Sequence, residues 1–171
     1  MYYGKKALLW TCLVTMLLGA GLHFLYSAVP GAITALLSPV NESLWEHGKI
    51  IFWPYLLAAV WLNRGRPGGI RPWLLALPLM CLLMLLLGYW YHITLGGEAM
   101  WVDLVLYVLI MALGFWLPTR FSGPFQGVKW MLPGAAVLVL GVLIALFTLW
   151  PPEHILFADL SGASAWFQIP C

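Results

Sequence analysis

The run WLLALPLMCLLMLLLGYWYHITL (residues 73–95) decides the fold class of this chain. It contains no acid, lysine or arginine, and His92 is its one histidine. A helix of about 20 apolar residues crosses the hydrocarbon core of a bilayer, which is about 30 Å thick. The run therefore predicts a membrane-spanning helix.

The composition extends this expectation to the whole chain. Of its 171 residues, 63% are hydrophobic and 8% are charged, whereas soluble domains have about 45–50% apolar and about 25% charged residues. So few charges cannot cover the surface of a soluble fold. We therefore expect an all-α integral membrane bundle in which residues 1–171 form a single transmembrane domain. The net charge of +2 and the lack of a basic patch argue against a nucleic-acid partner.

Five apolar segments predict five transmembrane helices, at about residues 7–29, 39–63, 73–95, 99–118 and 130–150. The second reaches a sufficient length only when it is extended back to about residue 39, with Ser38 or Asn41 as its N-cap. We expect the first to be retained, because its apolar run exceeds the roughly 7–15 residues of a signal-peptide core. Residues 30–40 are too short to cross and predict an interfacial or re-entrant segment.

Lysine and arginine predict the orientation. All eight except Lys49 lie at the ends that would be cytoplasmic if the N-terminus is inside: Lys5, Lys6, Arg64, Arg66, Arg71, Arg120 and Lys129. The positive-inside rule then predicts a multi-pass cell-membrane protein with a cytoplasmic N-terminus and an extracytoplasmic C-terminus. The opposite ends hold all six acids and all four histidines: Glu42, Glu46, Glu98, Asp103, Glu153, Asp159, His23, His47, His92 and His154.

Three of these groups, His23, His92 and Asp103, lie inside apolar runs. Ionisable groups within a bilayer are costly, and they usually face the bundle interior and mark function. In the second predicted helix, Glu42, Glu46 and Lys49 have the spacing i, i+4 and i+7 and would share one face. We therefore expect a polar pocket that opens on the outer side.

Acid/base chemistry is the first role expected of this pocket. The candidate catalytic residues are Glu42, Glu46, His47, His23, His92 and Asp103. Glu46 or Glu42 would be the acid or base, the histidines its partners, and Asp103 the orienting carboxylate. The candidate substrate-binding residues are Asn41, Ser43, Lys49, His154 and Asp159.

Structural alternatives remain open for the same residues. The two glutamates would then pair with Lys49 or cap a helix, and Asp103 would only hold helices together. The tail at residues 151–171 is expected to pack back over the pocket through Ile155, Leu156, Phe157, Trp166 and Phe167, either as a lid or as an interfacial segment.

A metal cofactor also stays open. The histidines and acids at one end would supply enough ligands for zinc or another divalent metal. However, the sequence has no HExxH or HxxxH motif, so the spacing identifies no ligand set.

The segment PVNESLWEHGK (residues 39–49), with LHFLY before it and PPEHILFAD at residues 151–159, resembles an uncharacterised family of small bacterial polytopic membrane proteins. The resemblance covers most of the chain and implies a bacterial membrane protein without implying a chemistry.

The leading functional hypothesis is an enzyme that acts on a lipid or lipid-linked substrate from the outer leaflet. A small-solute transporter or channel subunit is the first alternative, and it would require a homo-oligomer to build a path across the membrane. A non-catalytic assembly partner is the second.

Overall fold

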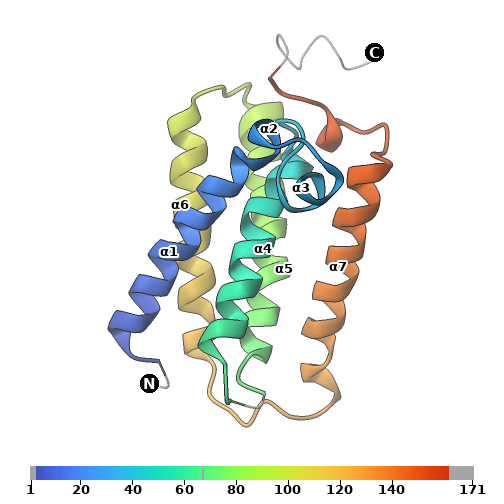
Figure 1. Cartoon of the computed structure of the whole chain (residues 1–171). Coiled ribbons are helices and arrows are strands. Elements are labelled where there is room, and N and C mark those ends of the chain that lie inside the picture. The colour runs from blue at the N-terminus through green and yellow to red at the C-terminus, as the bar shows by residue number, and fades with distance from the viewer. Residues whose placement is uncertain (1–2, 67, 162–171) are drawn as a thin grey trace.

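The structure, a computed structural model, describes residues 3–66 and 68–161, and within these ranges all regular structure is helical. Five long helices run alternately up and down in one bundle (Figure 1): α1 (Lys5–His23), α4 (Leu44–Leu62), α5 (Arg71–Gly88), α6 (Met100–Trp116) and α7 (Leu132–Leu149). The predicted all-α class is confirmed.

Four helical segments of the described residues are long and apolar enough to cross a membrane: Lys5–His23, Arg71–Thr94, Met100–Arg120 and Val128–Leu149. The sequence predicted five, and α4 accounts for the difference. Its 19 residues are enough in number, but Glu46, His47 and Lys49 in its first turns make it more polar. Large apolar side chains such as Leu17 and Leu138 face outwards from the other helices, and these apolar surfaces are compatible with a lipid bilayer.

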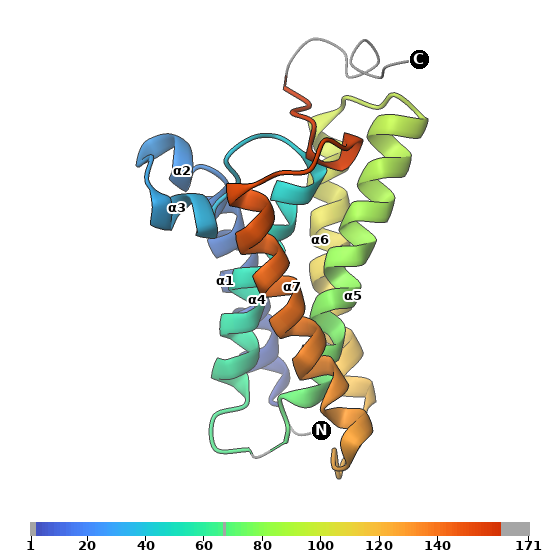
Figure 2. The same cartoon turned by 90° about the vertical axis from the view of Figure 1, so that its right-hand side faces the viewer.

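Helix α4 lies in the middle of the bundle in Figure 1 and on the side of α2 and α3 in Figure 2, and it packs against α1 and α5. Tyr55 of α4 is fully buried, with its ring 5.7 Å from that of Trp73 in α5 and 5.4 Å from that of Phe115 in α6. Glu46 and Lys49 of α4 are buried among these neighbours, which lowers the cost of placing charged groups in an apolar bundle.

Two predicted boundaries were wrong at the end of the bundle that carries the acids and histidines. The first span does not continue to residue 29: α1 ends at His23, and a separate short helix, α2 (Leu25–Ala28), follows it. The break coincides with a tertiary contact, since the Ser38 hydroxyl donates a hydrogen bond to Leu22 O and accepts one from Tyr26 N.

The second predicted span begins five residues too early. Ser43, rather than Ser38 or Asn41, is the N-cap of α4, and its hydroxyl accepts a hydrogen bond from Glu46 N at 3.3 Å. Ser43 and Glu46 have the S-x-x-E spacing of a capping box, a signal that was overlooked. Glu42 therefore lies before the helix, and the predicted Glu42–Glu46–Lys49 stripe does not form.

Residues 30–40 contain the short helix α3 (Ala32–Leu37), which lies beside α4 and α7. The described part of the tail folds back over the same end of the bundle, as expected. In its short helix η4 (Ile155–Phe157), the Phe157 ring lies 5.3 Å from the rings of Trp45 and Phe147. The predicted contacts of Trp166 and Phe167 fall outside the described residues.

Candidate functional site

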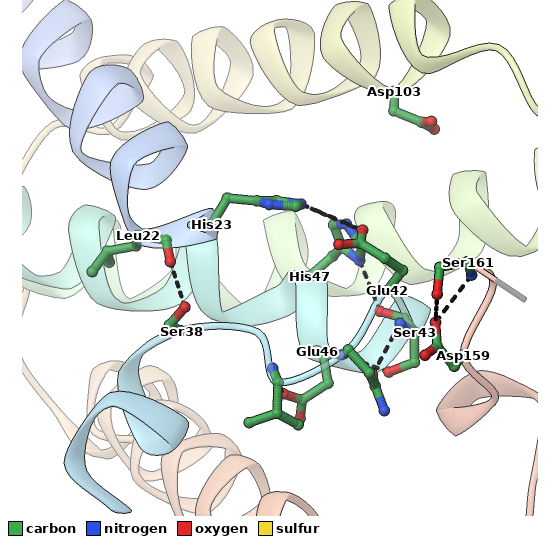
Figure 3. Close-up of polar contacts among 12 residues, drawn as sticks. Leu22, His23, Ser38, Glu42, Ser43, Glu46, His47, Asp103, Asp159 and Ser161 are labelled. Atoms are coloured by element: carbon green, nitrogen blue, oxygen red, sulfur yellow. Dashed lines mark hydrogen bonds and ion pairs between the residues drawn. The ribbon is translucent and has the colours of Figure 1, made fainter. Parts of the chain in front are cut away.

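Three of the candidate catalytic side chains meet where the end of α1 lies beside the start of α4 (Figure 3). His23 is the last residue of α1, His47 lies in the first turn of α4, and Glu42 lies in the loop before α4. The three ligand-type atoms form a nearly equilateral triangle: Nε2 of His23 and Nε2 of His47 are 3.2 Å apart, and Glu42 Oε2 lies 3.5 Å and 3.3 Å from them. We call these residues the triad.

The backbone fixes the tautomer of His47. Its Nδ1 lies 2.8 Å from the carbonyl oxygen of Ser43, and because a carbonyl can only accept, Nδ1 must carry the proton. In neutral His47, Nε2 is then a lone pair that faces a carboxylate oxygen and the second imidazole. The triad is therefore a cluster of electron-pair donors, and a proton or a cation at its centre would stabilise it.

The electrostatics of Glu42 follow from this arrangement. Hydrogen bonds from His23, and then from His47 when its Nε2 is also protonated, hold the pKa of the Glu42 carboxyl well below its ordinary value, since both stabilise the ionised form. Glu42 is consequently a carboxylate at neutral pH and can hold a cation, whereas the neutral Nε2 of His47 is left as the proton acceptor.

The loop before α4 is held by its own polar residues, which positions Glu42 between the two histidines. Ser38 is fully buried and bonds to the end of α1. Asn41 Oδ1 accepts a hydrogen bond from Ser43 N at 3.1 Å, which forms a tight turn directly around Glu42. The loop is thus tied both to α1 and to the start of α4.

The remaining predicted pair, His92 and Asp103, also forms. His92 lies in a π-helical segment, η1 (Tyr89–Thr94), that continues α5, and such wide turns are frequent at functional sites. Its Nε2 lies 2.8 Å from Asp103 Oδ1 of α6, and its Nδ1 lies 2.8 Å from Gly97 O. Since both ring nitrogens face oxygen acceptors, His92 satisfies both only as a positively charged imidazolium.

One pocket of about 400 Å³ joins the two groups. It is lined on one side by Glu42 and His47 and on the other by His92 and Asp103, and Figure 3 shows Asp103 on α6 across the opening from the triad. Leu160 and Ser161 of the tail complete the lining. The pocket therefore places a basic wall opposite an acidic imidazolium.

Glu46 does not join this pocket. Its carboxylate is buried, lies 2.6 Å from Lys49 Nζ and accepts a hydrogen bond from Val40 N at 2.8 Å. Lys49 is fully buried and also donates to the carbonyl of Ala35 at 2.7 Å. The pair ties the last carbonyls of α3 to α4, so its geometry is that of a structural contact.

The candidate substrate-binding residues divide in the same way. Asn41 and Ser43 are used in the turn and the cap, and Lys49 in the buried pair. His154 is exposed and bonds within the tail. Asp159 is exposed beside the pocket, where hydrogen bonds from the Ser161 backbone and then its hydroxyl lower the pKa of the carboxyl. None of the five is among the residues that line the pocket.

Two features of the pocket were missed. Glu98, which precedes α6, and Ser161 of the tail both line the pocket. The sequence predicted only that they lie at this end of the bundle and assigned neither to a site. The π-helical segment that orients His92 has no signal in the sequence, because its run YWYHIT is equally compatible with an α-helix.

Comparison with known proteins identifies the family of this chain but no activity. One family profile, described as a family of unknown function, matches residues 2–164. The chain belongs to this family, DUF6512. The match agrees with the resemblance of residues 39–49 and 151–159 to an uncharacterised family. No curated protein and no solved structure matches the chain.

Proposed function

We propose that this DUF6512 protein is a membrane-embedded hydrolase that cleaves an ester bond of a lipid or lipid-linked substrate in the pocket between the triad and His92. The observation that carries the proposal is the pairing of opposite roles across one pocket of about 400 Å³, with proton acceptors on one wall and an imidazolium on the other. General acid/base catalysis requires such a pair, and each partner contributes about 10²–10⁴-fold.

The chemistry assigns one step to each wall. His47 Nε2 takes a proton from a water molecule as its oxygen attacks the ester, and the Glu42 carboxylate stabilises the imidazolium that forms. The ester bond to the leaving oxygen breaks, and that oxygen replaces Asp103 Oδ1 as the acceptor of the His92 Nε2 proton and takes it. His92 then regains a proton, through solvent, from the basic wall. The products are an acid and an alcohol. Asp103 orients His92 and stabilises its charge.

We also propose that α4 crosses the membrane as a fifth span and that the pocket faces the extracytoplasmic side. Nineteen residues at about 1.5 Å per residue give about 28 Å, close to the hydrocarbon thickness. Arg64, Arg66 and Arg120 gather at the opposite end, which the positive-inside rule assigns to the cytoplasm. Alkaline phosphatase fused after residue 161 is expected to be active in a bacterial host. An inactive fusion of normal abundance would reverse the orientation.

The test of the activity uses protein reconstituted into vesicles of a total bacterial lipid extract, which contains both phospholipids and lipid-linked compounds. Wild-type protein is expected to convert one lipid class to its hydrolysis products, measured by mass spectrometry. Glu42→Gln is expected to slow the conversion about 100-fold or more, because the neutral amide does not stabilise the imidazolium that His47 becomes. The matched control is Glu153→Gln, an exposed acid of the tail outside the pocket lining. Identical lipid profiles for wild type and Glu42→Gln would contradict the proposal.

A transporter is the second candidate, and one observation favours it. A larger pocket of about 800 Å³ lies at the opposite end and is lined by Arg66, Arg71 and Arg120. Between the ends, however, Tyr55, Trp73 and Met111 are fully buried in a packed core. The vesicle experiment separates the two functions, since a transporter leaves the lipid composition unchanged.

A further inference from the structure

The triad has the dimensions of a metal site. For a tetrahedral ion with bonds of about 2.0–2.1 Å, neighbouring ligand atoms lie about 3.3–3.4 Å apart. The three distances in the triad are 3.2, 3.3 and 3.5 Å. Octahedral coordination at 90° would bring ligands with bonds of about 2.1 Å to about 3.0 Å, so the observed triangle fits tetrahedral coordination better.

The composition of the triad also matches that of catalytic zinc sites. Zinc in hydrolases is commonly held by two histidines and one glutamate, with a water or substrate as the fourth ligand. His23, His47 and Glu42 are the one such group of histidines, cysteines and acids found among residues 3–66 and 68–161. Glu42 and His47 also line the pocket, so a fourth ligand would come from there.

The surroundings of the triad prepare it for a cation. A histidine that binds a metal through one nitrogen usually donates its other N–H to a carbonyl or carboxylate, which fixes the ring and strengthens the donor. The bond from His47 Nδ1 to Ser43 O, at 2.8 Å, has this geometry. The backbone thus aims the free electron pair of Nε2 at the centre of the triad, where the carboxylate supplies negative charge.

Three segments that are distant in the sequence build this arrangement. α1 supplies His23, the loop before α4 supplies Glu42, and α4 supplies His47. At Gly19, one turn before His23, α1 approaches α4 so closely that a Cβ there would lie 2.5 Å from the backbone oxygen of Ile50. The small residue allows the two helices to meet at the distance that the triad requires.

We propose that His23 Nε2, His47 Nε2 and Glu42 Oε2 bind one divalent transition-metal ion, zinc above all, in a tetrahedral site open to the pocket. This inference rests on the proposed function in that the ion would serve the same pocket. There, a bound zinc would supply activated water at neutral pH in place of proton removal by the basic wall, since the ion would occupy the electron pairs of His47 and Glu42. His92 and Asp103 stay outside the ligand set and keep their role as the proton donor and its partner.

The test measures metal content and metal spectra, so it needs no substrate. Full-length protein purified in detergent is expected to carry about one zinc per chain by inductively coupled plasma mass spectrometry. Replacing zinc with cobalt(II) is expected to give the intense visible absorption bands of tetrahedral cobalt. His23→Ala, His47→Ala and Glu42→Gln are each expected to weaken zinc binding by more than the roughly 10–100-fold typical of a lost supporting residue.

The matched control is His154→Ala, which removes an exposed histidine at the same end of the molecule and is expected to leave the zinc content unchanged. Thermal unfolding of each variant reveals loss of fold, and a cobalt titration of any destabilised variant at low temperature keeps the result interpretable. Wild-type protein that binds neither zinc nor cobalt would overturn the proposal. Zinc binding that persists in each of the three ligand variants would also overturn the proposal. Cobalt absorption bands typical of octahedral coordination would overturn it as well.

The two proposals fail in different ways. A protein that binds zinc at the triad but leaves vesicle lipids unchanged would contradict the hydrolase and keep the metal site. A protein that hydrolyses lipid but binds neither zinc nor cobalt would contradict the metal site and keep the hydrolase.

Discussion

His92→Gln is expected to lower the rate of lipid conversion in vesicles about 10²–10⁴-fold while leaving the fold intact. The imidazolium of His92 faces the pocket from a π-helical turn and is bonded to both Asp103 Oδ1 and Gly97 O. Glutamine keeps a hydrogen-bonding side chain of similar length but cannot donate a proton to a leaving oxygen. Losing a general acid has an effect of this size.

The pH dependence of the rate separates proton donation from a merely structural role. In the wild type, the rate is expected to fall on the alkaline side as His92 loses its proton. In His92→Gln this alkaline limb is expected to vanish. Tyr107→Phe is the control, because the Tyr107 hydroxyl lies on the same helix as Asp103 but donates to Met16 O at 3.0 Å and lines no part of the pocket. A His92→Gln protein that keeps the wild-type rate and the alkaline limb would remove His92 from the mechanism.

Lys49→Met is expected to destabilise the protein by about 3–5 kcal/mol, the cost of leaving one member of a buried ion pair without its partner. Lys49 is fully buried, 2.6 Å from the Glu46 carboxylate. Its loss also leaves the carbonyls of Ala35 and Ser38 without their donor. The loss of stability would be measured by thermal or denaturant unfolding in detergent.

Two further variants give this prediction its controls. Lys129→Met removes an exposed lysine and is expected to change stability by less than about 0.5 kcal/mol. The double variant Lys49→Met with Glu46→Gln removes both charges and is expected to recover part of the loss. If Lys49→Met proves as stable as Lys129→Met but lipid conversion fails, then Lys49 acts on substrate, as the sequence first indicated.

Membrane insertion and the gathering of ionisable groups at one end could be predicted because both depend on composition along the chain. Apolar runs long enough to cross a bilayer are visible in the sequence, and so are the few ionisable residues within them. The cost of burying such groups also predicted that His23, His92 and Asp103 would find polar partners, and each does.

The roles of the two glutamates could not be separated in this way. Glu42 and Glu46 are four residues apart and were expected on one continuous helix, but α4 begins between them, with Ser43 as its N-cap. One carboxylate then turns to the histidines and the other to Lys49. Which partner each takes depends on α3 and α1 folding against α4, and these contacts join residues far apart in the chain.

The convergence of His23 and His47 from different helices is the claim on which the site depends, and cross-linking tests it directly. His23→Cys and His47→Cys would be combined in a chain carrying Cys12→Ala, Cys81→Ala and Cys171→Ala, then treated with dibromobimane, which fluoresces once it joins two nearby thiols. The control combines Lys6→Cys with His23→Cys, which lie about 26 Å apart along α1 at about 1.5 Å per residue. The account predicts rapid fluorescence from the 23/47 pair and none from the 6/23 pair. Equal, background-level fluorescence from both pairs would contradict it.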